Sequence, residues 1–192
     1  MARNVEFDYT EKLEAARNLF WEKGYHATSV HDIVAAMNLN RSSIYNSYGS
    51  KQDLFLKCLD NYADFKKDQY YKASLVKSRA IDALVYIVRD VVHQTLTDNK
   101  ACLIVNTIFE LAASDKAVKQ LLLTRGADLL RILEKTIAQA QADGDIKSTS
   151  SSAVIARYVL SNFSSFWSHY ILNQSKAEVN EMVDFFIEQL RK

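Results

Sequence analysis

The chain contains no proline and only four glycines in 192 residues. Sheets and long irregular loops depend on both residues, because proline fixes φ and glycine permits positive φ in turns. A chain almost without them is expected to be helical, with short connections. Hydrophobic residues make up 48% of the sequence, which is enough apolar surface for a sizeable core. The expected fold class is therefore all-α.

Apolar side chains recur at helical spacing along almost the whole chain. Helices are expected over residues 8–23, 29–38, 41–48, 50–73, 79–97, 103–113, 115–143, 152–173 and 176–191. Ser29 with Asp32, and Ser50 with Asp53, form capping patterns at two of the helix starts. Gly24 is a suitable residue for ending the first helix.

Residues 28–51 contain two short helices joined by a tight turn, which is the arrangement of a helix-turn-helix. Asn38 tolerates the left-handed conformation, and Asn40 can cap the second of these helices. In a helix-turn-helix this second helix enters the major groove, and its first residues meet base edges. Arg41 suits guanine and Asn46 suits adenine.

Four more side chains extend this predicted DNA-reading surface. Ser42 and Ser43 can donate or accept hydrogen bonds, and Tyr45 has the reach for a phosphate. Lys51 adds positive charge beside the amides of the next helix start. The net charge of the chain is only +1, so DNA binding must depend on this local placement.

The stretch AARNLFWEKGYHATSVHDIVAAMNLNRSSIYNSYGSKQDLF, within residues 10–57, resembles the DNA-binding domain of the TetR family of transcriptional regulators. That family reads approximately as A..LF...G followed by T(S/T)V..IA..AGVS...(L/I)Y.HF..K..L. The resemblance implies an all-helical homodimer, typically a repressor that a small ligand releases from double-stranded operator DNA. It also implies a helix-turn-helix domain over residues 1–52 and a larger helical effector-binding and dimerisation domain over residues 53–192.

The resemblance extends the set of predicted DNA-binding residues. Thr28 and Ser29 fall in the T(S/T)V motif, and His31 lies where some members place a base-reading residue. Ser47 replaces a frequent histidine that contacts phosphate, which weakens that contact. Tyr48 is included in the set, but it stands in place of a phenylalanine, and core packing is favoured for it over a DNA contact.

The last two expected helices are unusually rich in apolar and aromatic residues, enough to face both their own core and a partner. A two-fold dimer fits this pattern and a palindromic operator. The candidate dimer residues are Val154, Tyr158, Phe166, Tyr170, Met182 and Phe186. The alternative is an aromatic-rich core within a monomer.

The segment ACLIVNTIFELAASDKAV, residues 101–118, is similar to a GCL..N...E.A..D segment in a branch of the family that responds to electrophiles and oxidants. The resemblance makes Cys102 a candidate sensor, with Lys100 as a nearby cation. The alternatives are a buried structural cysteine and a small hydrophobic ligand held between the central helices. The residues expected on the inward sides of these helices are the candidates for lining such a pocket: Tyr62, Phe65, Tyr86, His93, Asn106, Phe109, Asn162 and Trp167.

Other classes of protein have little support in the sequence. It lacks the metalloprotease, nucleophile-elbow and phosphate-loop motifs, and its four histidines have no metal-ligand spacing, so neither an enzyme nor a cofactor is expected. No apolar run approaches the ~20 residues that span a bilayer, and two cysteines make no disulfide framework, so a cytoplasmic protein is expected. The main alternative is a helical protein-interaction module without DNA binding.

Overall fold

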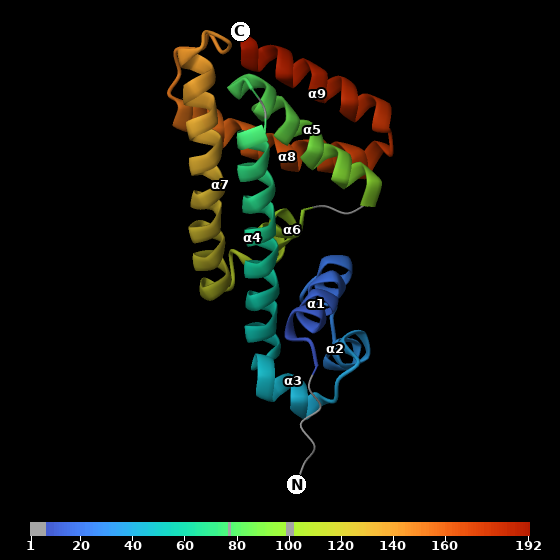
Figure 1. Cartoon of the computed structure of the whole chain (residues 1–192). Helices are drawn as coiled ribbons and strands as arrows, with labels where there is room; N and C mark the ends of the chain where they lie inside the picture. Colours follow the sequence, from blue (N-terminus) through green and yellow to red (C-terminus); the bar gives the residue numbers. More distant parts are fainter. Residues whose placement is uncertain (1–6, 77, 99–101) are drawn as a thin grey trace. The chain divides into compact units, whose positions relative to one another are not determined.

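The computed structural model describes residues 7–76, 78–98 and 102–192. Within these residues the chain forms helices and no strand, which confirms the expected all-α class. The helices are α1 (Tyr9–Lys23), α2 (Val30–Met37), α3 (Arg41–Tyr48), α4 (Lys51–Val76), α5 (Ala80–Asp98), α6 (Leu103–Leu111), α7 (Lys116–Ala142), α8 (Ser152–Asn173) and α9 (Lys176–Arg191), labelled in Figure 1. Among the described residues, no helix is both long and apolar enough to cross a membrane.

The chain divides into two compact units. The head unit comprises Met1–Asp64 and Leu103–Leu122, and the body unit comprises Phe65–Cys102 and Leu123–Lys192. The chain therefore passes from one unit to the other three times: within α4, at the start of α6 and within α7. The boundary expected from the sequence, after residue 52, falls inside the first turn of α4.

The head unit is held together by a small aromatic and aliphatic core. Ala16 and Phe20 of α1 are fully buried, as are Ile33 and Met37 of α2. The ring of Phe20 packs edge-on against the ring of Phe55 in α4, with centroids 5.0 Å apart. Burial of these side chains holds α1 against α2 and against the first part of α4.

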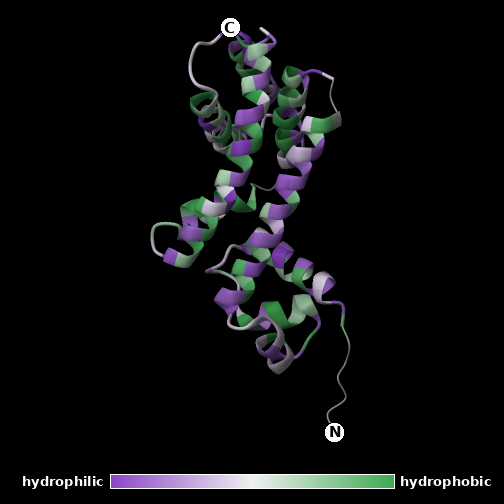
Figure 2. Ribbon diagram, turned by 60° about the vertical axis from the view of Figure 1, so that its left-hand side comes forward, coloured by the Kyte–Doolittle hydropathy of each residue, from purple (hydrophilic) through white to green (hydrophobic). Residues whose placement is uncertain are grey.

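In the body unit, α5, α8 and α9 pack against one another (Figure 1). Figure 2 shows hydrophobic and hydrophilic residues alternating along the helices of the chain, as expected where a helix buries only one face. An ion pair of 2.7 Å between Arg89 of α5 and Asp184 of α9 lies at the surface of this packing. The ammonium group of Lys66, although almost completely buried, donates hydrogen bonds to the side chains of Gln69 and Gln94.

Candidate nucleic-acid interface and effector region

Helix α3 is defined by residues at its two ends. The Asn40 side chain accepts a hydrogen bond of 2.8 Å from the Ser43 amide, and the turn before it uses Asn38 in the left-handed conformation at φ 49°. Gly49 ends the helix at φ 88°, and its amide donates to the Tyr45 carbonyl at 3.0 Å. These caps explain why an eight-residue helix of weak intrinsic propensity forms here.

The outward face of α3 carries most of the predicted DNA-reading residues. Arg41, Ser42, Tyr45 and Asn46 are exposed, and Ser43 and Ser47 are partly exposed. The Arg41 guanidinium lies 5.4 Å from the centroid of the Tyr45 ring, a cation–π distance. Hydrogen-bond donors for base edges and for phosphates are thus gathered on one face.

The burial of two side chains contradicts their prediction as DNA contacts. Tyr48 is completely buried, its hydroxyl donates to the Tyr9 carbonyl at 2.9 Å, and burial raises the pKa of Tyr48 to about 12. Thr28 is only 1% exposed, and its hydroxyl donates to the Gly24 carbonyl at 2.6 Å. Both side chains hold the head unit together and are not available to DNA.

The start of α2 places two further candidates at the surface. His31 and Ser29 are exposed, and Ser29 is the N-cap of the helix through a reciprocal bond with Asp32. Hydrogen bonds from Lys23, then from the Ser29 side chain and amide, lower the pKa of the Asp32 carboxyl. Asp32 is therefore a paired carboxylate, and its repulsion of a phosphate is reduced by Lys23 at 2.8 Å.

Lys51 lies in the first turn of α4, with its ammonium nitrogen 4.4 Å from the centroid of the Tyr25 ring. It is partly exposed, so the ammonium group keeps access to a phosphate. In the same turn the Ser50 side chain and amide lower the pKa of Asp53 by hydrogen bonding to its carboxylate. The predicted position of Lys51 beside a capped helix start is thus observed.

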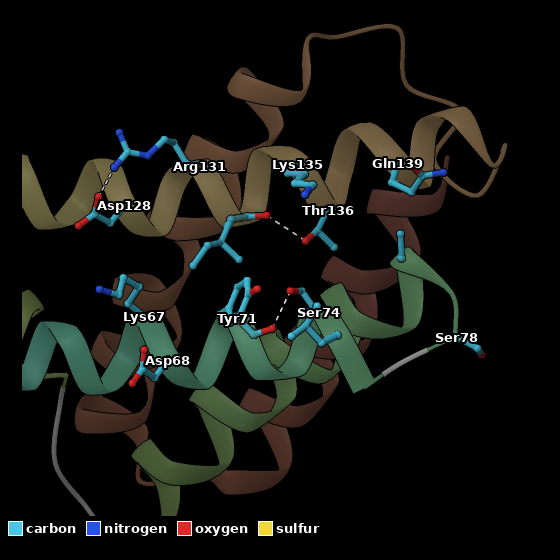
Figure 3. A pocket seen from close by; sticks show the side chains of 13 residues that line it. Lys67, Asp68, Tyr71, Ser74, Ser78, Asp128, Arg131, Lys135, Thr136 and Gln139 are labelled. Carbon is cyan, nitrogen blue, oxygen red and sulfur yellow. Dashed lines mark hydrogen bonds and ion pairs between the residues drawn. The ribbon is translucent and has the colours of Figure 1, made fainter.

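The body unit contains an open groove of about 670 Å³ between α4 and α7. Figure 3 shows Lys67, Tyr71 and Ser74 of α4 opposite Arg131 and Lys135 of α7. A second groove of about 540 Å³ runs between α5 and α9. Of the nine candidate effector residues, none lines the first groove, and Tyr86 and His93 line the second.

The other candidate effector residues have varied surroundings. Tyr62 is buried, with its ring 5.3 Å from that of Trp21, and Phe109 is 79% exposed. The Asn162 side chain donates to the Tyr158 carbonyl of its own helix at 2.8 Å. The remaining candidates are Phe65, which is exposed, and Asn106 and Trp167, which are partly exposed.

The two cysteines have different environments. Cys58 is fully buried, its thiol contacts the Leu13 carbonyl at 3.6 Å, and burial raises its pKa. Cys102 is partly exposed and directly precedes α6. Burial raises the pKa of Tyr70, with smaller electrostatic contributions from the neighbouring Cys102 and Asp90. Lys100, proposed as a cation near Cys102, lies outside the described residues.

The candidate dimer residues fall into two groups. Phe166, Tyr170 and Phe186 are buried in the body unit, and the rings of Phe166 and Phe186 pack edge-on at 5.7 Å. Their assignment to a partner surface is corrected, since the protomer's own core buries them. Val154 and Tyr158 are about half exposed, and Met182 is partly exposed.

Sequence reasoning missed Glu110 of α6. Its carboxylate accepts hydrogen bonds from the amides of Tyr25 and His26, at 3.0 Å and 2.7 Å. A glutamate on a helix surface normally indicates only solvent exposure. Glu110 and Asp115 occupy the E and D of the GCL..N...E.A..D segment, but that motif states no partner for either residue. The contact with a turn more than eighty residues earlier in the chain therefore required the structure.

Family models match most of this fold. Residues 13–58 match the model of bacterial regulatory proteins of the tetR family, and residues 79–186 match the tetracyclin repressor-like C-terminal domain. The chain belongs to the TetR family. Its TetR-type helix-turn-helix and the exposed donors of α3 make it a DNA-binding transcriptional regulator, as the resemblance implied.

Individual relatives agree with this assignment. The transcriptional regulator YezE of Bacillus subtilis (strain 168) is 28% identical over 166 residues, covering 83% of this chain and 84% of YezE. The transcriptional repressor ComR of Escherichia coli (strain K12) is 28% identical over 143 residues, covering 73% and 68%. These relatives are regulators of transcription.

A solved structure supports the fold. The regulator CifR, as a cysteine mutant complexed with a 26-bp double-strand operator DNA, superposes with a TM-score of 0.81 at 21% identity. The alignment covers 97% of this chain and 98% of CifR. At this identity the similarity shows the architecture of the chain and does not identify its operator or its effector.

Proposed function

We propose that this TetR-family regulator is a homodimeric repressor that reads operator DNA with α3 and is released by an effector. The observation that carries the proposal is the division of α3 into two faces. Arg41, Ser42, Tyr45 and Asn46 are exposed on one face, while Ile44 and Tyr48 anchor the other in the core. Because the helix is already held in place, its hydrogen-bond donors do not have to become ordered when DNA binds.

The two-fold partner is proposed to pack on the exposed apolar side chains of α8 and α9. Val154 and Tyr158 of α8 and Phe185 of α9 are 49%, 52% and 63% exposed, and they supply apolar area that remains uncovered in one protomer. A dimer places two copies of α3 on half-sites of a palindrome, about 34–36 Å apart.

An amphipathic organic anion in the α4–α7 groove is the proposed effector. Tyr71 and Leu75 supply apolar surface that is more than half exposed, and Lys135 supplies positive charge from the opposite helix, where Arg131 is paired with Asp128 (Figure 3). A groove of this size suits a drug-sized ligand. Modification of Cys102 is the alternative trigger, favoured by its partial exposure and by its position at the start of α6.

Release requires the effector to favour the DNA-incompetent state of the dimer. A 100-fold loss of operator affinity corresponds to about 2.7 kcal/mol of coupling, which lies within the usual range for allosteric sites. The proposal places operator reading in residues 1–52 and effector binding and dimerisation in residues 53–192. It also places the protein in the cytoplasm, where its operator lies, and gives it no enzymatic activity.

A mobility-shift assay on DNA from upstream of the coding region tests the proposal. Wild type should form a sequence-specific complex whose affinity falls steeply with salt, because phosphate contacts release counterions. Arg41→Ala should lose at least about tenfold in affinity, the order expected for one base contact. Lys147→Ala, an exposed cation of the α7–α8 loop, is the matched control and should bind as wild type does. Absence of any specific complex would favour the protein-interaction module.

A further inference from the structure

The 103–122 segment leaves the body unit and joins the head unit. Its first residue follows Cys102 and its last precedes Leu123, and both of these neighbours belong to the body unit. The segment contains α6 and the first residues of α7. A displacement of the body unit that moves either end of this segment is therefore delivered, through the covalent chain, to a part of the head unit.

The segment is attached to the head unit by the Glu110 contact, which consists of the Glu110 carboxylate and the amides of Tyr25 and His26. These two amides directly follow Gly24, the residue that ends α1, and precede α2. Donor–acceptor distances of 3.0 Å and 2.7 Å correspond to charge-assisted hydrogen bonds, which are stronger than neutral ones. The turn that sets the position of α2 is therefore fixed by α6.

Gly24 makes the close approach of Glu110 possible. A Cβ atom at this position would lie 3.1 Å and 3.2 Å from the two carboxylate oxygens of Glu110. The backbone of Gly24 has φ 80°, which is unfavourable for other residues. The end of α1 thus lacks a side chain at the point where the carboxylate reaches the backbone.

A second contact fixes the same segment to the start of α4. The Gln52 side chain donates a hydrogen bond of 2.6 Å to the Asp115 carboxylate, whose other oxygen accepts from the amides of Ala117 and Val118 at the start of α7. Asp115 also contributes, after burial, to the raised pKa of Tyr25. The 103–122 segment therefore contacts the helix-turn-helix both before α2 and after α3.

We propose that Glu110 is a positioning residue for DNA recognition. Its carboxylate holds the turn before α2, and thereby α2 and α3, in the arrangement that reads operator DNA. This inference rests on the proposed function, since it assigns a residue that holds α2 and α3 in place for reading the operator.

Operator affinity of Glu110 variants is the first test, measured by fluorescence anisotropy. Glu110→Ala should lower the affinity at least about tenfold, because two turn amides lose their acceptor. Glu110→Gln keeps a side-chain oxygen of similar reach and should recover most of that loss. The matched control is Glu188→Ala on α9, whose carboxylate pairs only with Lys192 at the surface among the described residues, and it should leave the affinity unchanged.

Residue-resolved amide exchange separates positioning from general destabilisation. In Glu110→Ala the amides of residues 25 and 26 should exchange at least about tenfold faster, while amides within α1 and α4 keep the wild-type rate. If the whole head unit exchanges faster, the residue is structural and the positioning role is overturned. Unchanged exchange at residues 25 and 26 overturns the contact itself.

A double-mutant cycle with Gly24→Ala tests the close approach. Gly24→Ala should weaken operator binding in the wild-type background, since the new methyl group meets the carboxylate and the backbone is strained. In the Glu110→Ala background the same substitution should weaken binding by a smaller factor, because only the backbone strain remains. Equal factors in both backgrounds would contradict the proposed geometry.

The failure of the inference and that of the proposed function are distinguishable. If wild type binds no operator, the proposed function fails and the positioning role falls with it, while the exchange rates at residues 25 and 26 still report on the contact. If wild type binds and Glu110→Ala binds equally well with faster exchange at these amides, the proposed function stands and the positioning role is overturned.

Discussion

The head unit and the body unit hold their polar side chains in different ways. In the head unit the polar contacts that define α2, α3 and α4 are local, each joining residues three positions apart: Ser29 to Asp32, Asn40 to Ser43, and Ser50 to Asp53. The body unit has local caps of the same kind at Ser151 and Ser175, but its polar side chains also join distant residues: Lys66 to Gln94, Arg79 to Asp145, and Arg89 to Asp184. In the head unit, local contacts define the ends of the reading helices and the long-range Glu110 contact holds the turn before α2, whereas in the body unit distant contacts join one helix to another.

The largest effect is expected from placing a charge in each core. Ile44→Asp in the head unit and Leu133→Asp in the body unit should each cost several kcal/mol, since both positions are almost fully buried. Ile44→Asp should abolish operator binding and accelerate amide exchange in the head unit only. Leu133→Asp should accelerate exchange in the body unit. If either variant opened both units equally, the two-unit comparison would fail.

Alkylation of the two cysteines should differ by at least about 100-fold in rate. Cys58 in the head unit is fully buried and its pKa is raised by burial, so little reactive thiolate is present or accessible. Cys102 in the body unit is partly exposed. Mass spectrometry after treatment with N-ethylmaleimide, with Cys102→Ser as the control, measures both rates. Comparable rates would show that the head core opens readily.

Alkaline conditions should destabilise the head unit through Tyr48. Its pKa is raised by burial from 10.0 to about 12 in the folded chain. Between these values the unfolded chain loses the phenolic proton and the folded chain keeps it, so the free energy of unfolding falls as the pH rises. The contribution is on the order of 1–3 kcal/mol. In Tyr48→Phe the unfolding free energy should fall less steeply over this pH range, as measured by urea unfolding.

The smallest effect is expected from the exposed ion pair of the body unit. Arg89 and Asp184 are 52% and 61% exposed, so their attraction is screened by water. Arg89→Ala should lower the free energy of unfolding by less than about 1 kcal/mol, with no change in operator affinity. A loss of several kcal/mol in urea unfolding would mean that this pair, unlike most surface pairs, organises the α5–α9 packing.

Sequence reasoning was most successful where structure is local. The caps at Ser29, Asn40 and Ser50, the left-handed Asn38 and the glycine ends of α1 and α3 all follow from residues a few positions apart. The exposed face of α3 followed from the same helical spacing. Thr28 was misplaced on the DNA surface, and Tyr48 was kept among the DNA contacts although core packing was favoured for it, because a motif position does not state whether a hydroxyl points to solvent or to the core.

The body unit was less predictable because its features depend on contacts between distant segments. Helical spacing identified the apolar side chains of α8 and α9, but not which of them the protomer's own core covers; Phe166, Tyr170 and Phe186 were therefore assigned to a partner. The α4–α7 groove is lined by residues of two helices, up to Leu75 in α4 and from Asp128 in α7, that are more than fifty positions apart in the chain. Glu110 escaped prediction for the same reason.

The discontinuous head unit has a practical consequence for building chimeric regulators. Joining the first 58 residues of this chain, the part that the DNA-binding family model covers, to the effector domain of a relative would transfer the reading helix without α6. The turn after Gly24 would then face a foreign α6 with no guarantee of a carboxylate at the matching position. A graft that carries residues 103–122 together with the N-terminal part preserves the native acceptor, and a modular exchange in this protein therefore needs two crossover segments.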